Sequence, residues 1–300
     1  MNELAGELSA IGAALGWTIS AVCWTIAGHR VGSLVVNTVR LILSMPIFIL
    51  FGLMVSGQWI PHQAPVHAWL WLSLSGVTGF FLCDMFLFKS LLVIGPRLSL
   101  LIFSLAPIVA SVCGWAWLGE RLTLRDMLGV SVALSGVIWV VLESPDKERR
   151  VRLLKDVFRP GIGLAILAMV TQGLSAVLSK HGMRDFEDPV AATQIRAMAG
   201  LICFLLLLWK MGKLRNCVEA MGDRKIFSVL LAGTFAGPTI GVALLMFALT
   251  RIPSGLALTF VSLTPVLILP FSHFLHKEQV SFRAMTGAGV ACAGLGILLL

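Results

Sequence analysis

Uncharged apolar segments long enough to cross a lipid bilayer recur along the whole chain. Three of them, Leu8 to Gly28, Leu41 to Ile60 and Leu98 to Gly119, contain no Asp, Glu, Lys or Arg. Only 13% of the 300 residues are charged, whereas a soluble domain averages about 25%. A soluble chain with so little charge could not cover its surface, but a helix of about 20 apolar residues spans a bilayer. The chain is therefore predicted to be a membrane protein.

Further apolar runs bring the number of predicted transmembrane helices to ten. They lie near residues 68–88, 126–142, 161–179, 190–209, 226–248, 254–275 and 284–300. Strands of a membrane barrel would be about 10 residues long and would alternate polar with apolar side chains. The runs show neither feature, so we predict an all-α polytopic fold.

The basic residues divide unequally between the two sets of loops that ten helices would leave. One set, near residues 29–35, 89–97, 143–160, 210–225 and 276–283, carries 16 Lys and Arg, and the other carries five. Short cytoplasmic loops collect Lys and Arg. We therefore predict a multi-pass protein of the cell (plasma or inner) membrane with both termini outside. Anionic lipid headgroups account for the basic loops without a nucleic acid partner.

The sequence contains two related halves. At an offset of 158 residues, the aligned pairs are Ser104 and Ser262, Pro107 and Pro265, Glu120 and Glu278, Arg125 and Arg283, and Gly136 and Gly294. At an offset of 156, Arg40 aligns with Arg196. Each half, 1–142 and 161–300, is predicted to hold five helices, joined by a basic linker at 143–160. Five is odd, so the second half would enter the membrane from the opposite face, as in the inverted repeats of secondary transporters.

These motifs resemble the EamA repeat of the drug/metabolite transporter superfamily. The first half carries S-L-A-P followed by G-E-R-L-T-x-R-D-x-L-G, and the second carries S-L-T-P followed by K-E-Q-V-S-x-R-A-x-x-G. The Arg in the second helix of each half belongs to the same pattern. The resemblance covers nearly the whole chain and implies two inverted five-helix EamA repeats around a central cavity. The chain departs from the family at Lys277, where the motif has Gly, and in the termini, which familiar members keep in the cytoplasm.

The leading functional hypothesis is a secondary transporter without a cofactor, working as a monomer or homodimer. It would export small metabolites, such as amino acids or related amphipathic compounds, by alternating access. The chain lacks G-x-x-x-x-G-K-[ST], which argues against direct ATP hydrolysis. It also lacks the converging groups that an intramembrane enzyme needs and any C-x-x-C pair for a metal. A channel or lipid-handling scaffold of the same architecture stays an alternative.

Asp84, in GFFLCDMFLFKS, is the acidic residue that lies well inside an apolar segment. Insertion scales put the cost of a central Asp at roughly 2.5–3.5 kcal/mol. The functional interpretation is a protonation site that couples transport to protons, or a counter-ion for a cationic substrate. The alternative is a salt bridge with Lys89, or a position near headgroup water. Its counterpart in the second half is Val242, so the carboxylate is not shared by the repeats.

Two further pairs occupy equivalent positions in the halves. Arg40 and Arg196 each lie about five residues inside a helix, where they would serve as a gate or an anion contact, or would extend to the headgroups. We favour a structural or gating role over direct substrate contact. Pro107 and Pro265 lie in the middle of their helices, where proline breaks the hydrogen-bond ladder. They are predicted to act as hinges, with a fixed kink as the alternative.

The remaining candidates are side chains that the resemblance places beside the central cavity. They are Trp17, Ser20 and Trp24 in the first helix, Phe80 in the third, and Gln172, Ser175 and Ser179 in the sixth. The alternatives are a headgroup position for Trp and interhelical hydrogen bonds for Ser and Gln.

Three smaller expectations concern packing and turns. The small residues of Gly12-x-x-x-Gly16 and Gly287-x-Gly289 predict close helix packing. His273 is the histidine expected within a helix. In GERLTLRDMLG, residues 119–129, Thr123 is expected to cap the following helix, and the charges are expected to bind nothing.

Overall fold

The computed structural model describes residues 2–94, 96–142, 160–264, 266–267 and 282–299. Every regular element among these described residues is a helix. In chain order they are α1 (Asn2–Val31), α2 (Ser33–Ser56), α3 (Val66–Gly76), η1 (Val77–Cys83), α4 (Asp84–Ile94), α5 (Pro96–Phe103), α6 (Ala106–Cys113), η2 (Gly114–Leu118), α7 (Leu124–Leu142), α9 (Pro160–Gly182), α10 (Pro189–Lys210), α11 (Leu214–Gly222), α12 (Arg224–Thr234), η3 (Phe235–Gly241), α13 (Val242–Arg251), α14 (Ser254–Val261) and α16 (Phe282–Leu299).

Seven helical stretches of the described chain are long and apolar enough to cross a membrane. They are Glu3–Gly28, Ser33–Met54, Val66–Ser90, Ser99–Leu118, Gly161–Gly182, Pro189–Lys210 and Arg224–Arg251. A shorter apolar helix covers Met285–Leu298. The predicted all-helical membrane architecture is confirmed. The number ten stays a prediction, because the ninth predicted helix runs into residues 268–281, which lie outside the described residues, as does most of the 143–160 linker.

The elements of the second half repeat those of the first at the offset found in the sequence. α12, η3 and α14 begin and end 158 residues after α3, η1 and α5, and α16 begins 158 residues after α7. Each half therefore interrupts its third predicted membrane helix with a π-helical segment, η1 or η3. Wide π turns of this kind are frequent at functional sites.

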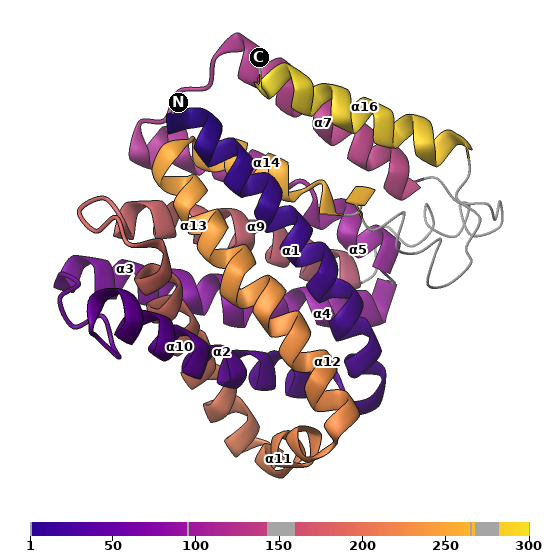
Figure 1. The fold of residues 1–300 in the computed structure, drawn as a ribbon. Helices are drawn as coiled ribbons and strands as arrows, with labels where there is room; N and C mark the ends of the chain where they lie inside the picture. Colours follow the sequence, from indigo (N-terminus) through magenta and orange to yellow (C-terminus); the bar gives the residue numbers. More distant parts are fainter. Residues whose placement is uncertain (1, 95, 143–159, 265, 268–281, 300) are drawn as a thin grey trace.

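The helices α7 and α16 pack along each other at one edge of the molecule (Figure 1). A Cβ atom added to Gly136 would lie 2.2 Å from the backbone nitrogen of Ala291. A Cβ atom added to Gly294 would lie 2.3 Å from that of Ala133. Gly136 and Gly294 are repeat equivalents, and so are Ala133 and Ala291. The pair thus makes the same close contact twice, with the two halves exchanged.

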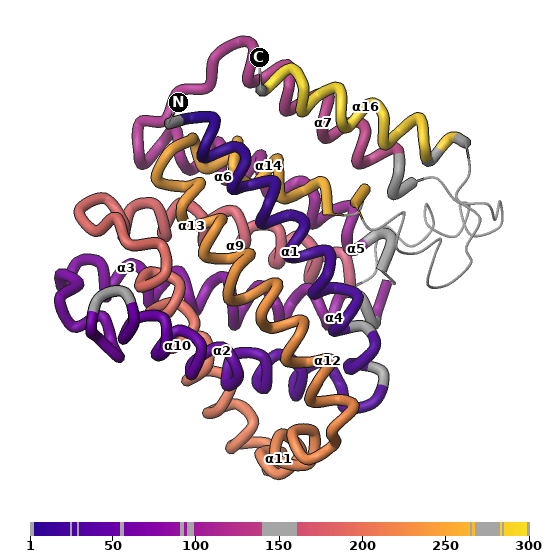
Figure 2. The backbone as a smooth tube through the Cα atoms, viewed as in Figure 1, coloured from indigo at the N-terminus to yellow at the C-terminus, as the bar shows by residue number. Residues whose placement is uncertain are grey.

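The helices of the two halves also interleave in the body of the molecule. α1 of the first half packs on α12, η3 and α13 of the second, and α9 of the second packs on α3, η1 and α4 of the first (Figure 2). Gly16 allows one of these approaches, because a Cβ atom there would lie 2.4 Å from the carbonyl oxygen of Ala236. The predicted close packing of Gly287-x-Gly289 is present at Gly287, whose carbonyl oxygen lies 2.7 Å from a Cβ atom added to Gly136. At Gly289 it is wrong, since nothing lies within 4 Å of the Cβ position.

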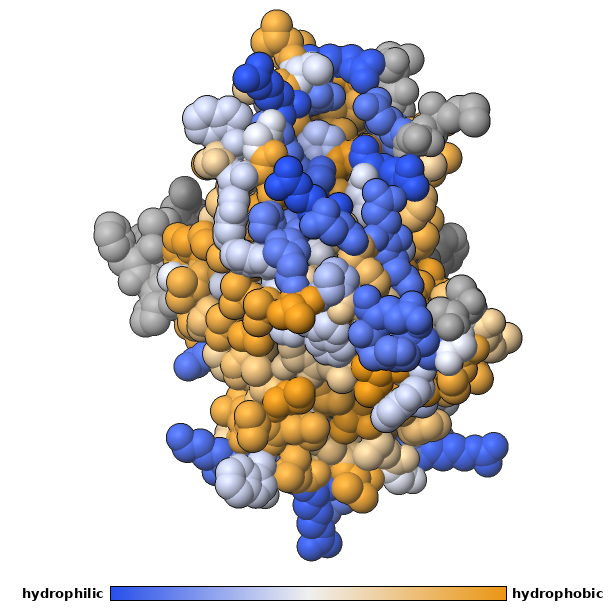
Figure 3. Space-filling view, turned by 90° about the vertical axis from the view of Figure 1, so that its left-hand side faces the viewer, coloured by the Kyte–Doolittle hydropathy of each residue, from blue (hydrophilic) through white to orange (hydrophobic). Residues whose placement is uncertain are grey.

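One face of the molecule carries the ends of α2, α9 and α13 and the starts of α3, α7 and α10. We call it the polar face. Hydrophilic side chains gather in its middle and upper part, while hydrophobic side chains dominate its flanks (Figure 3). The turn before α7 lies here, and Thr123 caps that helix as predicted. Its hydroxyl accepts a hydrogen bond from the Asp126 nitrogen (3.2 Å), and the Asp126 carboxylate accepts one from the Thr123 nitrogen (2.8 Å).

Candidate functional site

A buried ion pair joins α2 to the start of α4. Nη2 of Arg40 contacts Oδ2 of Asp84, and the two side chains are 4% and 17% exposed. Asp84 pairs with Arg40, and no ion pair joins it to Lys89 among the described residues, so the predicted alternative of a salt bridge with Lys89 is wrong. The headgroup position for Arg40 is also wrong, because the guanidinium is buried among helices. Breaking a buried pair by removing one partner costs about 3–5 kcal/mol, so both groups hold each other in place.

Two aromatic rings lie against the guanidinium groups. Cζ of Arg40 is 4.6 Å from the centre of the Trp24 ring and 6.0 Å from that of Phe80. Cζ of Arg196 lies 5.2 Å from the same Phe80 ring. A cation within about 6 Å of a ring centre is attracted by the ring's quadrupole. The structure thus brings together five predicted residues, Trp24, Arg40, Phe80, Asp84 and Arg196, which we call the charged cluster.

Arg196 forms hydrogen bonds only with neutral groups among the described residues. Its Nε donates to Oγ of Ser75 (3.0 Å), its Nη2 to Oγ of Ser175 (3.1 Å), and its Nη1 to Sδ of Met246 (3.2 Å). The side chain is buried, so the headgroup position is wrong for Arg196 as well. Among the described residues, no carboxylate forms an ion pair with it.

The serines predicted at the cavity form hydrogen bonds between the halves. Oγ of Ser20 donates to the carbonyl oxygen of Gly233 (2.7 Å), and Oγ of Ser175 donates to that of Ser75 (2.9 Å). Gly233 is the repeat equivalent of Ser75, so the same bond forms twice with the halves exchanged. Oγ of Ser179 also lies 2.6 Å from Oγ of Ser75. These contacts support the interhelical alternative for the three predicted serines.

The two remaining cavity candidates border the same helices. Oε1 of Gln172 accepts a hydrogen bond from Sγ of Cys83 (3.4 Å), the residue before Asp84. Trp17 packs on η3, because a Cβ atom at Gly241 would lie 2.9 Å from its Cδ1. Both side chains are half-buried.

Several buried polar atoms have no hydrogen-bond partner among the described residues. At the charged cluster they are Nε1 of Trp24 and Nε of Arg40, with both amide atoms of Asn37 one helical turn away in α2, and in α12 and η3 they are the hydroxyls of Thr234 and Thr239. Asn37 and both threonines were not among the residues predicted from the sequence, although Asn37 lies one helical turn before Arg40. Buried polar groups normally have partners, so the atoms of Trp24, Arg40 and Asn37 mark a place where a ligand or water would be hydrogen-bonded.

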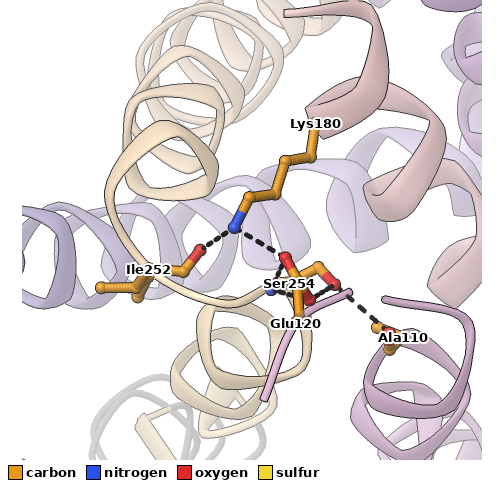
Figure 4. Close-up of polar contacts among 5 residues, drawn as sticks. All are labelled: Ala110, Glu120, Lys180, Ile252 and Ser254. Atoms are coloured by element: carbon orange, nitrogen blue, oxygen red, sulfur yellow. Dashed lines mark hydrogen bonds and ion pairs between the residues drawn. The ribbon is translucent and has the colours of Figure 1, made fainter. Parts of the chain in front are cut away.

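On the polar face, Glu120 connects the two halves (Figure 4). Its Oε1 lies 2.6 Å from Nζ of Lys180, and its Oε2 accepts from the backbone nitrogen (3.0 Å) and Oγ (2.7 Å) of Ser254. Lys180 also donates to the carbonyl oxygen of Ile252 (2.7 Å), and Ser254 to that of Ala110 (3.2 Å). The expectation that the charges of GERLTLRDMLG bind nothing is therefore wrong for Glu120. We call Glu120, Lys180 and Ser254 the latch.

A second contact between the halves on this face involves two histidines. Nε2 of His67 in α3 lies 3.3 Å from Nε2 of His181 in α9, and the rings of Trp71 and Trp117 pack on His181. His273 was the one histidine predicted to lie within a helix, and it lies outside the described residues. That expectation is wrong, since His67 and His181 both lie within helices. Nothing in the local sequence indicates this pair, because it joins residues 114 positions apart.

The predicted proline break is present at Pro107. α5 ends at Phe103, a turn follows at Ser104 and Leu105, and α6 restarts with Pro107 as its second residue. α14 ends at Val261, the position equivalent to Phe103. Pro265 itself lies outside the described residues. Whether either proline acts as a hinge stays a prediction.

The described residues also form a pocket on the polar face, apart from the charged cluster. Phe51, Gln58, Pro61, Phe186, Asp188 and Gln194 contribute to its lining. The predicted central cavity beside the charged cluster stays a prediction.

A known protein family matches this chain along almost its whole length. The model of the EamA-like transporter family matches the chain twice, over residues 4–142 and 159–300. The chain belongs to the EamA-like transporter family. Members of this family, part of the drug/metabolite transporter superfamily, are transporters rather than enzymes. The two EamA repeats are the halves found in the sequence.

Solved structures show the same fold. One chain, described as "Crystal structure of protein", superimposes with a TM-score of 0.73 at 18% sequence identity, covering 98% of this chain and 96% of its own length. The comparison with curated proteins finds no match. At this identity the likeness concerns the fold alone.

Proposed function

We propose that this EamA-family protein is a secondary transporter that exports small amphipathic metabolites, such as amino acids and related compounds, by alternating access. The observation that supports this most is the exchanged pair of hydrogen bonds, Ser20 to Gly233 and Ser175 to Ser75, beside the charged cluster. Inverted repeats that share the same contacts in exchanged roles can exchange the small differences in shape between them. That exchange opens a site at their interface to either side of the membrane.

Asp84 is proposed to couple transport to protons. Its carboxylate is paired with Arg40 inside the bundle, and its equivalent Val242 cannot titrate. Protonation of Asp84 would remove the charge that holds Arg40, and deprotonation would restore the pair. A group whose ion pair depends on its proton links proton binding to a structural change.

Counterflow in proteoliposomes tests both proposals. Vesicles containing the purified full-length chain are loaded with an unlabelled amino acid mixture, and uptake of each labelled amino acid is measured with and without an imposed pH gradient. We expect the unlabelled amino acids inside the vesicles to stimulate uptake of the labelled ones. We also expect the pH gradient to change this uptake in the wild type but not in Asp84→Asn. A mutant that keeps the gradient response would show that Asp84 is not the coupling residue. Flux without stimulation from the far side would favour a channel.

A further inference from the structure

The charged cluster carries more positive than negative charge. Arg40 and Arg196 come from equivalent positions of the two halves and approach the same Phe80 ring, at 6.0 and 5.2 Å. Asp84 neutralises Arg40. The repeat equivalent of Asp84 is Val242, so the second half offers no carboxylate at that position, and Arg196 is bound by two serines and a methionine sulfur. Two guanidinium groups and one carboxylate leave one positive charge.

An isolated buried charge is costly in a membrane protein. Ionisable groups inside membrane segments normally pair with one another or line a pathway for ions or substrates. Arginine stays protonated when buried, because its intrinsic pKa is too high for it to neutralise itself easily. The charge of Arg196 is therefore left without an opposite charge among the described residues.

The surrounding unpartnered atoms favour an oxygen-rich anion. Nε1 of Trp24, Nε of Arg40 and Nδ2 of Asn37 are hydrogen-bond donors without a partner among the described residues, all of them buried. Trp24 lies against Arg40 at 4.6 Å, and Asn37 precedes Arg40 by one helical turn. Carboxylate oxygens accept several hydrogen bonds each, and guanidinium groups bind them in bidentate geometry.

We propose that the charged cluster binds the carboxylate of a substrate with a net charge of −1, and that Arg196 is the residue that recognises it. This inference rests on the proposed transport function and narrows its substrate class. A 2-hydroxy acid would leave the loaded cluster neutral. The amino acid of the same skeleton, a zwitterion, would leave it positive, and the corresponding amine would add a second uncompensated charge.

A charge-matched set of probes tests the assignment by binding. The probes share the leucine or the phenylalanine skeleton and are the 2-hydroxy acid, the amino acid and the amine. Thermal unfolding of the purified chain is followed at increasing probe concentration. We expect the 2-hydroxy acid to raise the Tm most, the amino acid less, and the amine not at all. An amine that stabilises as well as the acid, or acids that leave the Tm unchanged, would overturn the assignment.

Variants separate recognition by Arg196 from a general effect of charge. Arg196→Met should weaken the response to the 2-hydroxy acid about tenfold or more, since it removes a charge-assisted contact. Arg251→Met removes an exposed arginine of the same half and should leave the response unchanged. If Arg196→Met keeps the full response, Arg196 does not recognise the anion. If it does not fold, the wild-type ranking of the probes still decides the substrate charge.

Counterflow with the same probes distinguishes this inference from the proposed function. Exchange of 2-hydroxy acids supports both. Exchange of amines but not of acids would support the proposed carrier function and would contradict recognition of an anionic substrate. If 2-hydroxy acids raise the Tm but no probe is exchanged, the result would support the anion-binding site and would contradict the proposed carrier function.

Discussion

At the scale of single residues, the two halves differ in the ion pair between Arg40 and Asp84, which the first half forms within itself. Both halves carry the arginine, but the first half has Asp84 opposite it where the second half has Val242. The free energy that it costs to place Asp84 in a membrane helix is offset by its ion pair with the guanidinium of Arg40, which is itself buried. The sequence shows each member of the pair separately. Their contact depends on packing of α2 against the start of α4, which no local pattern records.

A double-mutant cycle measures the strength of this pair. Arg40→Gln and Asp84→Asn each leave one buried charge without its partner, so each should lower thermal stability. The loss should lie near the low end of the about 3–5 kcal/mol cost of breaking a buried pair, because Asp84 keeps 17% exposure. The double variant should be clearly more stable than the sum of the single losses predicts, by about 0.5–3 kcal/mol. Additive losses in the cycle would show that the contact contributes no coupling.

At the scale of elements, the interleaving of the halves depends on glycines in the π-helical segments. A Cβ atom at Gly79 in η1 would lie 2.2 Å from Oγ of Ser175, and one at Gly237 in η3 would lie 2.2 Å from Oγ of Ser20. Gly79 and Gly237 are repeat equivalents. Each allows the first helix of the other half to come close enough for the serine hydrogen bond.

Alanine at these glycines should disturb both helix interfaces in the same way. Gly79→Ala and Gly237→Ala should each cost about 1–3 kcal/mol, the usual effect of overfilling a tight contact. Gly163→Ala in α9 is the matched control, because nothing lies within 4 Å of its Cβ position. It should be neutral or slightly stabilising, since alanine favours helix. Thermal unfolding of the three variants checks this, and equal behaviour of all three would contradict the packing argument.

The latch is the second device at this scale, because it ties α9 and the start of α14 to the turn after η2. Glu120→Gln removes the ion pair with Lys180 and should favour opening of the polar face. Cys113 can report this opening because Glu120 packs directly on the next residue, Gly114. A Cβ atom added to Gly114 would lie 2.1 Å from Oε2 of Glu120. In a chain that keeps only this cysteine, labelling by a water-soluble maleimide should become several-fold faster. Glu219→Gln, which removes the exposed pair with Arg215, should not change it.

At the scale of the whole molecule, hydropathy and internal repetition were sufficient to predict the helical class, the two repeats and the family. The offset of 158 reappears in the first residues of five pairs of elements, α3 and α12, η1 and η3, α4 and α13, α5 and α14, and α7 and α16. The sequence also placed Trp24, Arg40, Phe80, Asp84 and Arg196 among the candidates. It did not predict the roles of Ser75, Asn37, Glu120 or the pair of His67 and His181. Except at Asn37, whose amide atoms have no partner among the described residues, those roles arise from contacts between halves, whereas sequence patterns report on neighbours within one helix.

Orientation is a property of the whole chain that the bias of Lys and Arg predicts. With 16 basic residues in one set of loops and five in the other, we predict both termini outside. Fusion of a cytoplasm-active and a periplasm-active reporter after Leu300 checks this. Activity of the cytoplasmic reporter would contradict the prediction and agree with familiar members of the family.

Alternating access is the central claim, and paired distance measurements test it without knowledge of the substrate. Spin labels are placed at the exposed residues Arg121 and Arg184 on the polar face, and at Arg30 and Lys225 on the opposite face. Distances are then measured in the wild type and in Glu120→Gln. We predict a shift of the polar-face pair to longer distances, together with a shift of the opposite pair to shorter ones. Distances that stay fixed, or that lengthen on both faces together, would contradict alternating access.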